Sequence, residues 1–126
     1  MAAVGTHRDL HAWRESIALA EIIYRATASF PKSELFGLAS QLRRCAISIP
    51  SNIAEGAARN STREFVQFLG ISCGSLSELE TQIELATRLG YLKQNSDSER
   101  QLNRVGRIVR ALRKSLRDKV LAEASK

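Results

Sequence analysis

Apolar residues recur at spacings of three and four along most of the chain, in four stretches separated by polar residues, glycine or proline. This spacing places the apolar residues on one face of a helix. No stretch shows the alternation of apolar and polar residues that is typical of strands. The pattern predicts an all-α protein with helices over about residues 8–29, 34–58, 62–89 and 97–119.

Each helix is expected to turn one mostly apolar stripe toward a shared core. In the first helix the stripe is Leu10, Trp13, Ile17, Ala20, Tyr24 and Thr27. In the third helix it is Phe65, Leu69, Ser72, Leu76, Leu79, Ile83 and Ala86, and in the fourth it is Leu102, Val105, Val109, Leu112 and Leu116. The first helix is expected to end before Pro31, because proline disfavours a helical conformation in the residue that precedes it.

The second helix contains a proline in its middle. The apolar stripe keeps its phase on both sides of Pro50, and its members are Leu35, Leu38, Leu42, Cys45, Ile49 and Ile53. An interior proline costs about 3 kcal/mol. Burial of several large aliphatic side chains, at roughly 1.5–3 kcal/mol each, more than offsets that cost. We therefore expect one helix, kinked at Pro50, in which Ser51 or Asn52 can bond carbonyl groups that the proline leaves free.

The ends of the helices carry recognisable signals. Capping residues are expected before the second, third and fourth helices: Ser33, Ser61 with Glu64, and Ser96 with Glu99. Gly90 is expected to end the third helix. Connections of a few residues make neighbouring helices antiparallel. The sequence thus predicts an antiparallel up-down-up-down four-helix bundle that forms a single domain over residues 1–126.

The composition is that of a soluble protein, and the chain carries a net charge of +6. No secretion signal and no run of about 20 apolar residues is present, so a cytoplasmic location without membrane association is expected. The two cysteines, Cys45 and Cys73, lie in apolar helical patterns without metal-like spacing. We interpret both as buried thiols of a reducing compartment rather than as a disulfide.

Almost all of the excess positive charge lies in the last quarter of the chain. Residues 96–126 hold nine basic and four acidic residues, whereas residues 1–95 hold ten basic and nine acidic ones. Arginine suits bidentate contacts to phosphate. The fourth helix has no aromatic residue for base stacking, so backbone contacts are expected. The candidate nucleic-acid contacts are Arg100, Arg104, Arg107, Arg110, Arg113, Lys114 and Arg117.

A polar stripe also follows the second helix, with members at steps of three and four: Arg44, Ser48, Asn52, Glu55 and Arg59. Glu55 and Arg59 have the spacing of a helical ion pair. We interpret the stripe as a structural network, within the chain or at a contact between subunits. A ligand site is the alternative.

Three weaker motifs have simpler explanations. Gly70–Gly74 matches the G-x-S-x-G pattern of hydrolases, but that chemistry needs a strand before the serine, and small helix-packing residues explain it better. His7 and His11 have the spacing of helical metal ligands, yet no third ligand is evident. Glu78, Glu80 and Glu84 fit a solvated helix face, or a contact with the basic fourth helix, better than an acid/base pair. No metal and no cofactor is expected.

Several motifs together resemble one bacterial family. They are Asp9–Trp13 (DLHAW), Phe36–Leu38 (FGL), Gln41–Arg44 (QLRR), Ser48–Gly56 (SIPSNIAEG), Glu64–Phe65, Gly74–Glu80 (GSLSELE) and Leu89–Leu92 (LGYL). Over about residues 9–92 the chain is similar to the four-helix-bundle proteins first noticed as reading frames inside intervening sequences of large-subunit ribosomal RNA genes. Residues 96–126 lie outside these motifs.

The resemblance implies a helical bundle that assembles into a homopentamer. It also implies kinship with the accessory variability protein of diversity-generating retroelements, a basic pentamer that partners a reverse transcriptase and nucleic acid. Apolar residues off the inward stripes would supply surface for a neighbouring subunit: Ile22, Ile47, Val66, Ile71 and Leu85.

Two functions remain in competition. The leading hypothesis is a non-enzymatic, oligomeric accessory protein that binds an RNA or DNA backbone and is associated with ribosomal RNA, a ribonucleoprotein or a reverse transcriptase. The alternative is a protein-interaction scaffold whose basic helix docks an acidic partner or the acidic third helix of a neighbouring subunit.

Overall fold

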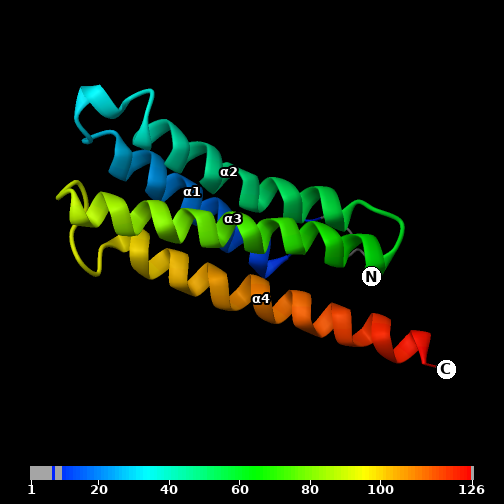
Figure 1. Ribbon diagram of the computed structural model, residues 1–126. Helices are drawn as coiled ribbons and strands as arrows, with labels where there is room; N and C mark the ends of the chain where they lie inside the picture. The colour runs from blue at the N-terminus through cyan, green and yellow to red at the C-terminus, as the bar shows by residue number, and fades with distance from the viewer. Residues whose placement is uncertain (1–6, 8–9, 126) are drawn as a thin grey trace.

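The structure is a computed structural model that describes residue 7 and residues 10–125. It consists of four helices and one short 3-10 turn (Figure 1). In chain order these are α1 (His11–Thr27), the turn η2 (Lys32–Glu34), α2 (Leu38–Ala57), α3 (Thr62–Arg88) and α4 (Asp97–Ala124). No strand occurs in the part of the chain that is described, and the predicted all-α four-helix bundle is confirmed.

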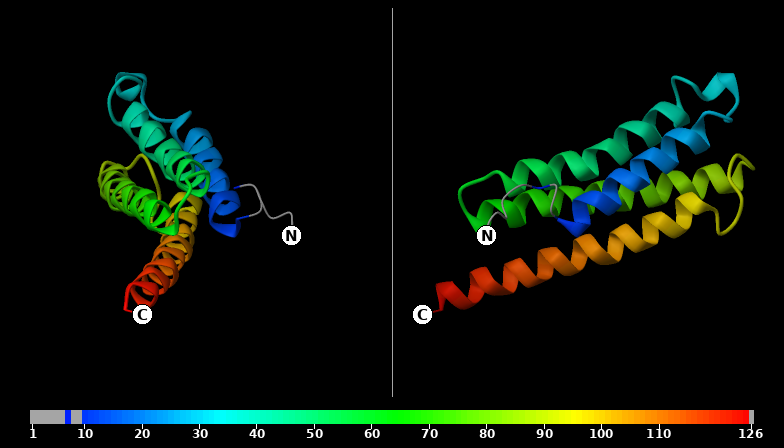
Figure 2. Two further views of the ribbon diagram at one scale, coloured as in Figure 1. Left: turned by 90° about the vertical axis from the view of Figure 1, so that its right-hand side faces the viewer. Right: turned by 180° about the vertical axis from the view of Figure 1, so that it is seen from behind.

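Each helix packs against two others. α1 and α3 both contact α2 and α4, so the four helices surround one apolar core. In Figure 1 the chain runs to the left along α1, returns along α2, runs left again along α3 and returns along α4. Figure 2 shows that the C-terminal end of α4 diverges from the ends of α2 and α3. The last buried residue of α4 is accordingly Val109, although the helix continues to Ala124.

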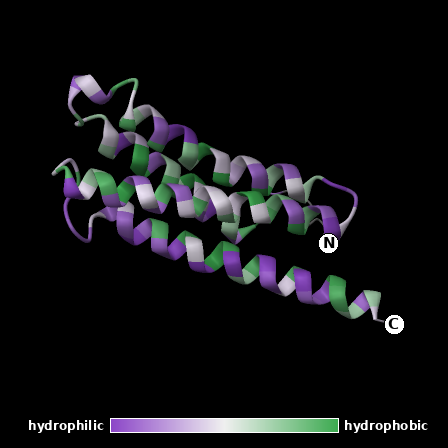
Figure 3. Cartoon of the chain, in the orientation of Figure 1, coloured by the Kyte–Doolittle hydropathy of each residue, from purple (hydrophilic) through white to green (hydrophobic). Residues whose placement is uncertain are grey.

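The core contains most of the predicted inward residues of α2, α3 and α4. Fully buried large side chains come from all four helices: Leu19, Ile23, Leu42, Ile49, Ile53, Leu69, Leu76, Leu79, Val105 and Val109. Figure 3 shows that hydrophilic positions interrupt the apolar ones along the whole of α4. That helix therefore gives one narrow stripe to the core and the rest of its surface to solvent.

The predicted inward stripe of α1 is right in part, since Leu10, Trp13 and Ala20 pack against the core and Thr27 is buried, but it is wrong at Ile17 and Tyr24. The buried residues of α1 are Ala12, Ser16, Leu19, Ile23 and Thr27, whereas Ile17 and Tyr24 are each 42% exposed. Two of the buried residues are polar, but the Ser16 hydroxyl donates to the Ala12 carbonyl oxygen at 2.6 Å and that of Thr27 to Ile23 at 2.7 Å. Hydrogen bonds of this kind allow a hydroxyl to be buried, and hydropathy alone does not count them.

The predicted start of α2 is also wrong. Residues Lys32–Glu34 form the separate turn η2, and α2 begins after Gly37, with no side-chain cap from Ser33. Instead the Glu34 Oε1 atom accepts a hydrogen bond of 3.2 Å from the Leu38 amide. Leu35, expected in the core, lies before the helix and is half exposed.

The helix α2 continues through Pro50, which is buried within it. The Asn52 side chain bonds a carbonyl of this helix, but that carbonyl belongs to Ser48, at 2.8 Å. The group that Pro50 leaves free is the carbonyl of Ala46, four residues before it. The prediction that the helix bends at Pro50 stays a prediction.

The capping predictions for α3 and α4 are confirmed. Ser61 accepts a hydrogen bond from the Glu64 amide, and Ser96 accepts one from the Glu99 amide, each at 3.2 Å. Gly90 ends α3 with a φ of +83°, a conformation that glycine adopts without strain. α4 continues five residues past the predicted end at residue 119. Among the described residues, no helix combines the length and the apolar character needed to cross a membrane.

Candidate nucleic-acid interface

The cations at the start of α4 are engaged within the chain. The Arg100 guanidinium donates to the Asp97 carboxylate and to the Asn95 carbonyl oxygen. The Nε of Arg104 donates to the Glu15 carboxylate of α1 at 2.7 Å. Gln101 donates to the same carboxylate at 3.0 Å, and these two bonds lower the pKa of Glu15, with the bond from Gln101 the larger cause. Gln101 and Arg104 thus tie the beginning of α4 to α1, whereas Arg100 bonds groups at the start of α4 itself.

The cations further along α4 are in a different situation. Within the described residues, Arg107, Arg110 and Arg117 make no ion pair and no hydrogen bond. Lys114 is intermediate, because its ammonium lies 2.8 Å from the Asp118 carboxylate and lowers the pKa of that carboxyl group. The seven cations predicted as one surface therefore include a paired group, Arg100 and Arg104, and arginines without an ion pair within the described residues, with Lys114 between the two.

Arg113 lies across α3 rather than in open solvent. Its Nε donates to the Val66 carbonyl oxygen at 3.2 Å. Its guanidinium covers Gly70, where an added Cβ would come within 3.0 Å of an Nη atom. A glycine at this position thus gives the guanidinium room to lie against the backbone of α3. We use the name "arginine row" for Arg107, Arg110, Arg113 and Arg117.

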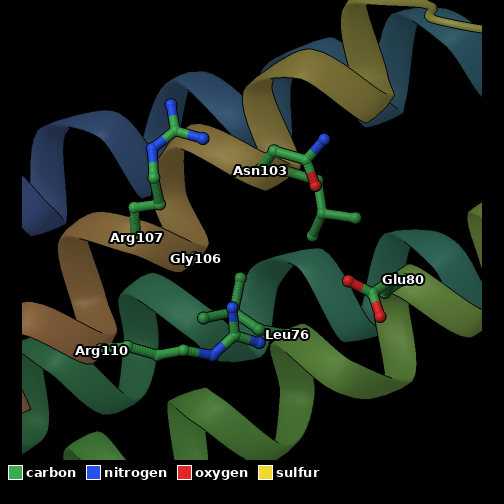
Figure 4. A pocket seen from close by; sticks show the side chains of 7 residues that line it. Leu76, Glu80, Asn103, Gly106, Arg107 and Arg110 are labelled. Atoms are coloured by element: carbon green, nitrogen blue, oxygen red, sulfur yellow. The ribbon is translucent and has the colours of Figure 1, made fainter.

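Two adjoining hollows follow the interface of α3 and α4 along the arginine row. One, of about 370 Å³, is lined by Cys73, Arg110, Arg113, Lys114 and Arg117. The other, of about 210 Å³, is lined by Leu76, Glu80, Leu102, Asn103, Gly106, Arg107 and Arg110. Figure 4 shows Arg110 reaching toward Leu76 of α3, whereas Arg107 turns away from it. Arg110 lines both hollows, and we refer to the two together as the groove.

Cys73 lies within this groove but is not activated. Its removal from solvent raises the pKa of the thiol, and the nearby guanidinium groups of Arg113 and Arg110 only partly oppose this effect. A thiol with a raised pKa stays protonated at neutral pH and is a weak nucleophile. The groove therefore offers positive charge rather than catalytic chemistry.

The polar stripe of α2 does not form one network. Ser48 donates to the Cys45 carbonyl oxygen at 2.7 Å and lies 2.6 Å from the Ser75 hydroxyl of α3, and Asn52 donates to Ser48. Together with the bond from the Cys45 thiol to the Ser75 carbonyl oxygen at 3.0 Å, these contacts join α2 to α3. The middle of the stripe thus serves the structure of the chain itself.

The ends of the stripe lie at the surface. Glu55 and Arg59 form the predicted ion pair at 3.2 Å, and the Arg59 guanidinium lies 4.8 Å from the centre of the Phe68 ring. Arg44 is exposed and lines a hollow of about 400 Å³ together with Gln41, Cys45, Ser48, Ser75, Glu78 and Gln82. A role of this end of the stripe at a subunit contact stays a prediction.

The remaining motifs do not assemble into a reactive site. Ser72 of the G-x-S-x-G match is fully buried inside α3, where its hydroxyl donates to the Ile49 carbonyl oxygen at 3.0 Å. Burial raises the pKa of Cys45 to about 12. The His7 ring packs edge-on against Trp13. Over residue 7 and residues 10–125, no group of three potential metal ligands comes together.

The sequence did not reveal the contacts that divide the cations. Glu15 and Gln101 lie 86 positions apart in the chain, so no local pattern joins them. Gly70 was recognised only as a small residue in a helix. The role of Gly70 could have been inferred from its position on the side of α3 that faces α4, the most basic helix.

The fold and this interface define a four-helix bundle whose last helix presents a row of arginines along its neighbour. The chain matches the family model described as "23S rRNA-intervening sequence protein" over residues 8–114, and it belongs to this family. The match continues well beyond Leu92, where the recognised motifs end, and includes α4 as far as Lys114. A search of curated proteins gave no match.

Proposed function

We propose that this protein is a non-enzymatic, oligomeric accessory protein of the cytoplasm that binds the backbone of RNA or DNA in association with 23S ribosomal RNA. The observation that carries the proposal is the arginine row, in which Arg107, Arg110 and Arg117 make no ion pair and no hydrogen bond within the described residues. Guanidinium groups that the fold does not use are available to an external anion.

Charge and family membership support the same function. Residues 96–126 hold five more basic than acidic residues, and phosphate backbones attract such a concentration of cations. The family takes its description from sequences that interrupt 23S ribosomal RNA, which makes RNA the first ligand to test.

An oligomer would strengthen this attraction. Ile47, Ile71 and Leu85 are exposed apolar residues, and Ile22 and Val66 are partly exposed, so the chain has surface for neighbouring subunits. Five chains of charge +6 would together carry about +30, a strong field for an anionic polymer. The homopentamer is therefore part of the proposal, and native mass spectrometry of the purified protein tests it.

One observation favours the scaffold as a second candidate. Arg104 shows that a cation of α4 can bind a carboxylate of another helix, here Glu15 at 2.7 Å. A protein partner with acidic side chains would use the arginine row in the same way. A polyglutamate peptide should then bind the protein at least as tightly as RNA of equal charge.

The test is a titration of fluorescent single-stranded RNA and DNA with the protein, followed by anisotropy at several salt concentrations. Phosphate binding predicts that the logarithm of the binding constant falls linearly with the logarithm of salt concentration. Absence of binding at about 50 mM salt, where electrostatic contacts are strong, would contradict the proposed function.

A further inference from the structure

We infer that the ligand backbone lies in the groove between α3 and α4, along the arginine row, and not across the whole basic surface of α4. This inference rests on the proposed function and gives that function a location. It assigns different roles to two parts of one helix. Arg104 joins α4 to α1 and Arg100 pairs with Asp97 at the start of α4, whereas Arg107 to Arg117 bind phosphodiester groups.

The first support comes from the state of the two groups of cations. Arg100 and Arg104 would have to give up the carboxylates of Asp97 and Glu15 before they could bind phosphate. Arg110 and Arg117 need no such exchange, because no carboxylate within the described residues lies within 4.0 Å of their guanidinium groups. The second group can therefore bind phosphate without first breaking an ion pair, and this favours it as the binding site.

The second support comes from α3, which forms the other side of the groove. The segment from Phe65 to Ser77 contains no acidic residue, and the positions nearest α4 are small or apolar. Val66, Gly70 and Cys73 all contact or face the cations of α4. The carboxylate of α3 that lines the groove is Glu80, in the hollow beside Arg107. The hollow beside Arg110, Arg113 and Arg117 is lined by no carboxylate of the described residues, so this stretch of α3 does not repel a phosphate.

The third support comes from the way Arg113 is held. Its Nε is bonded to the Val66 carbonyl oxygen, and this contact fixes the plane of the guanidinium over Gly70. The remaining N–H groups of the side chain stay available, since a guanidinium has five donors. Arg113 is thus a pre-positioned donor on the floor of the groove, which lowers the entropy cost of binding.

The spacing of the row suits a phosphodiester backbone. Arg110, Arg113 and Arg117 follow one another at steps of three and four residues and extend over about 10 Å of helix. A nucleic-acid strand in a duplex carries one phosphate per about 3.4 Å of axis, so about three phosphates come within reach.

A pair of matched double variants tests the location. R110Q/R117Q removes two unpaired cations, and R100Q/R104Q removes two paired ones, so both variants lose the same charge. All four residues are exposed, and circular dichroism should show unchanged helix content. We expect R110Q/R117Q to weaken binding of single-stranded RNA and DNA by about ten-fold or more near 0.1 M salt, and to reduce the salt slope by about 1.4.

The control variant separates the location from the function. R100Q/R104Q should change the affinity by less than about three-fold, through the general loss of charge alone. If R100Q/R104Q loses as much affinity as R110Q/R117Q, the groove is not the site, although the proposed function stands. If the unaltered protein binds neither RNA nor DNA, the function itself fails.

A variant on α3 provides a second measurement that leaves every arginine in place. Ser77 is exposed and lies one helical turn beyond Cys73, so Ser77→Glu puts a carboxylate beside the groove. Gln41→Glu serves as the control. It adds the same negative charge to α2, a helix that does not pack against α4. We expect Ser77→Glu to weaken binding at least three-fold more than Gln41→Glu. Equal effects of the two variants would overturn the inference.

Discussion

The helix α3 takes part in two interfaces of opposite character. On the side of α2, most buried polar groups are satisfied inside the chain: Ser72 bonds the Ile49 carbonyl, and Ser48 lies against Ser75, with the Gln82 Oε1 atom as an exception. On the side of α4, past Val109, the polar groups are guanidiniums that find only a backbone carbonyl or nothing within the described residues. An interface whose polar groups are mostly paired within the chain stabilises a fold, whereas one with unpaired cations is suited to bind an anion.

Close packing differs in the same way. At Gly56 of α2, an added Cβ would lie 2.6 Å from the Cβ of Phe68 in α3. At Gly70, on the other side of α3, it would meet only the flexible end of Arg113 at 3.0 Å. The α2/α3 interface is therefore rigid, whereas the α3/α4 interface can adjust to a ligand.

The largest expected effect is on stability, and it uses these glycines. Gly56→Ala should lower the free energy of unfolding by about 1–3 kcal/mol, because the helices must separate to admit the methyl group. Gly70→Ala should change it by less than about 1 kcal/mol, because the gain in helix propensity offsets the displacement of Arg113.

The control for this prediction is Gly74→Ala, since nothing lies within 4 Å of a Cβ at that position. This variant should be more stable than the parent chain by about 0.5–1 kcal/mol. Urea denaturation followed by circular dichroism measures all three variants. Equal midpoints for the variants at Gly56 and Gly70 would show that the two interfaces of α3 do not differ in packing.

The second prediction compares the cysteines, of which one lies in each interface. Burial raises the pKa of Cys45 to about 12, above the value of about 8.5 for an unfolded chain. The folded state thus favours the neutral thiol. This preference contributes fully to the stability of the fold below about pH 8.5, and the contribution is lost as the pH rises toward 12. Cys45→Ala should therefore lose less stability between pH 7 and pH 10 than the parent chain does.

Labelling with iodoacetamide gives the same comparison a chemical readout. Cys73 is less buried than Cys45, and Arg113 and Arg110 oppose the rise in its pKa. Mass spectrometry after reaction at pH 8 should find Cys73 modified several-fold faster, and the single Cys→Ser variants assign each adduct. Faster reaction at Cys45 would contradict the burial that we describe for the α2/α3 interface.

The smallest expected effect concerns the first part of α4. Glu15→Gln removes the carboxylate that receives Gln101 and Arg104, and it should lower the free energy of unfolding by less than about 1 kcal/mol at pH 7. The pKa of Glu15 is lowered in the folded protein, so its contribution is present above about pH 4.3 and is lost as the pH falls below it.

Glu21→Gln serves as the matched control. Glu21 pairs only with Arg25 of the same helix at 2.7 Å, an exposed pair that contributes little. Thermal unfolding at pH 7 and pH 3 should show a larger loss for Glu15→Gln at pH 7 and no difference at pH 3. Identical behaviour of the two variants at both pH values would mean that Arg104 is not anchored, and would remove the distinction between the two parts of α4.

Much of the fold followed from local patterns. The serine caps at Ser61 and Ser96 and the left-handed Gly90 depend on residues within four positions of each other, and all three predictions are confirmed. The start of α2 was not, because Ser33 has the residue type of a cap but lies in a separate turn. Residue type alone does not show which of several short polar stretches a helix will start from.

The sequence by itself determined four amphipathic helices and the concentration of cations in the last one, since periodicity, capping and charge are properties of neighbouring residues. Only the tertiary structure decided which side of α1 faces inward and which arginines find a carboxylate. Arg104 meets Glu15 across 89 positions of chain, a contact that exists only after the helices have packed. The unpaired arginine row is what remains after those distant pairings are made.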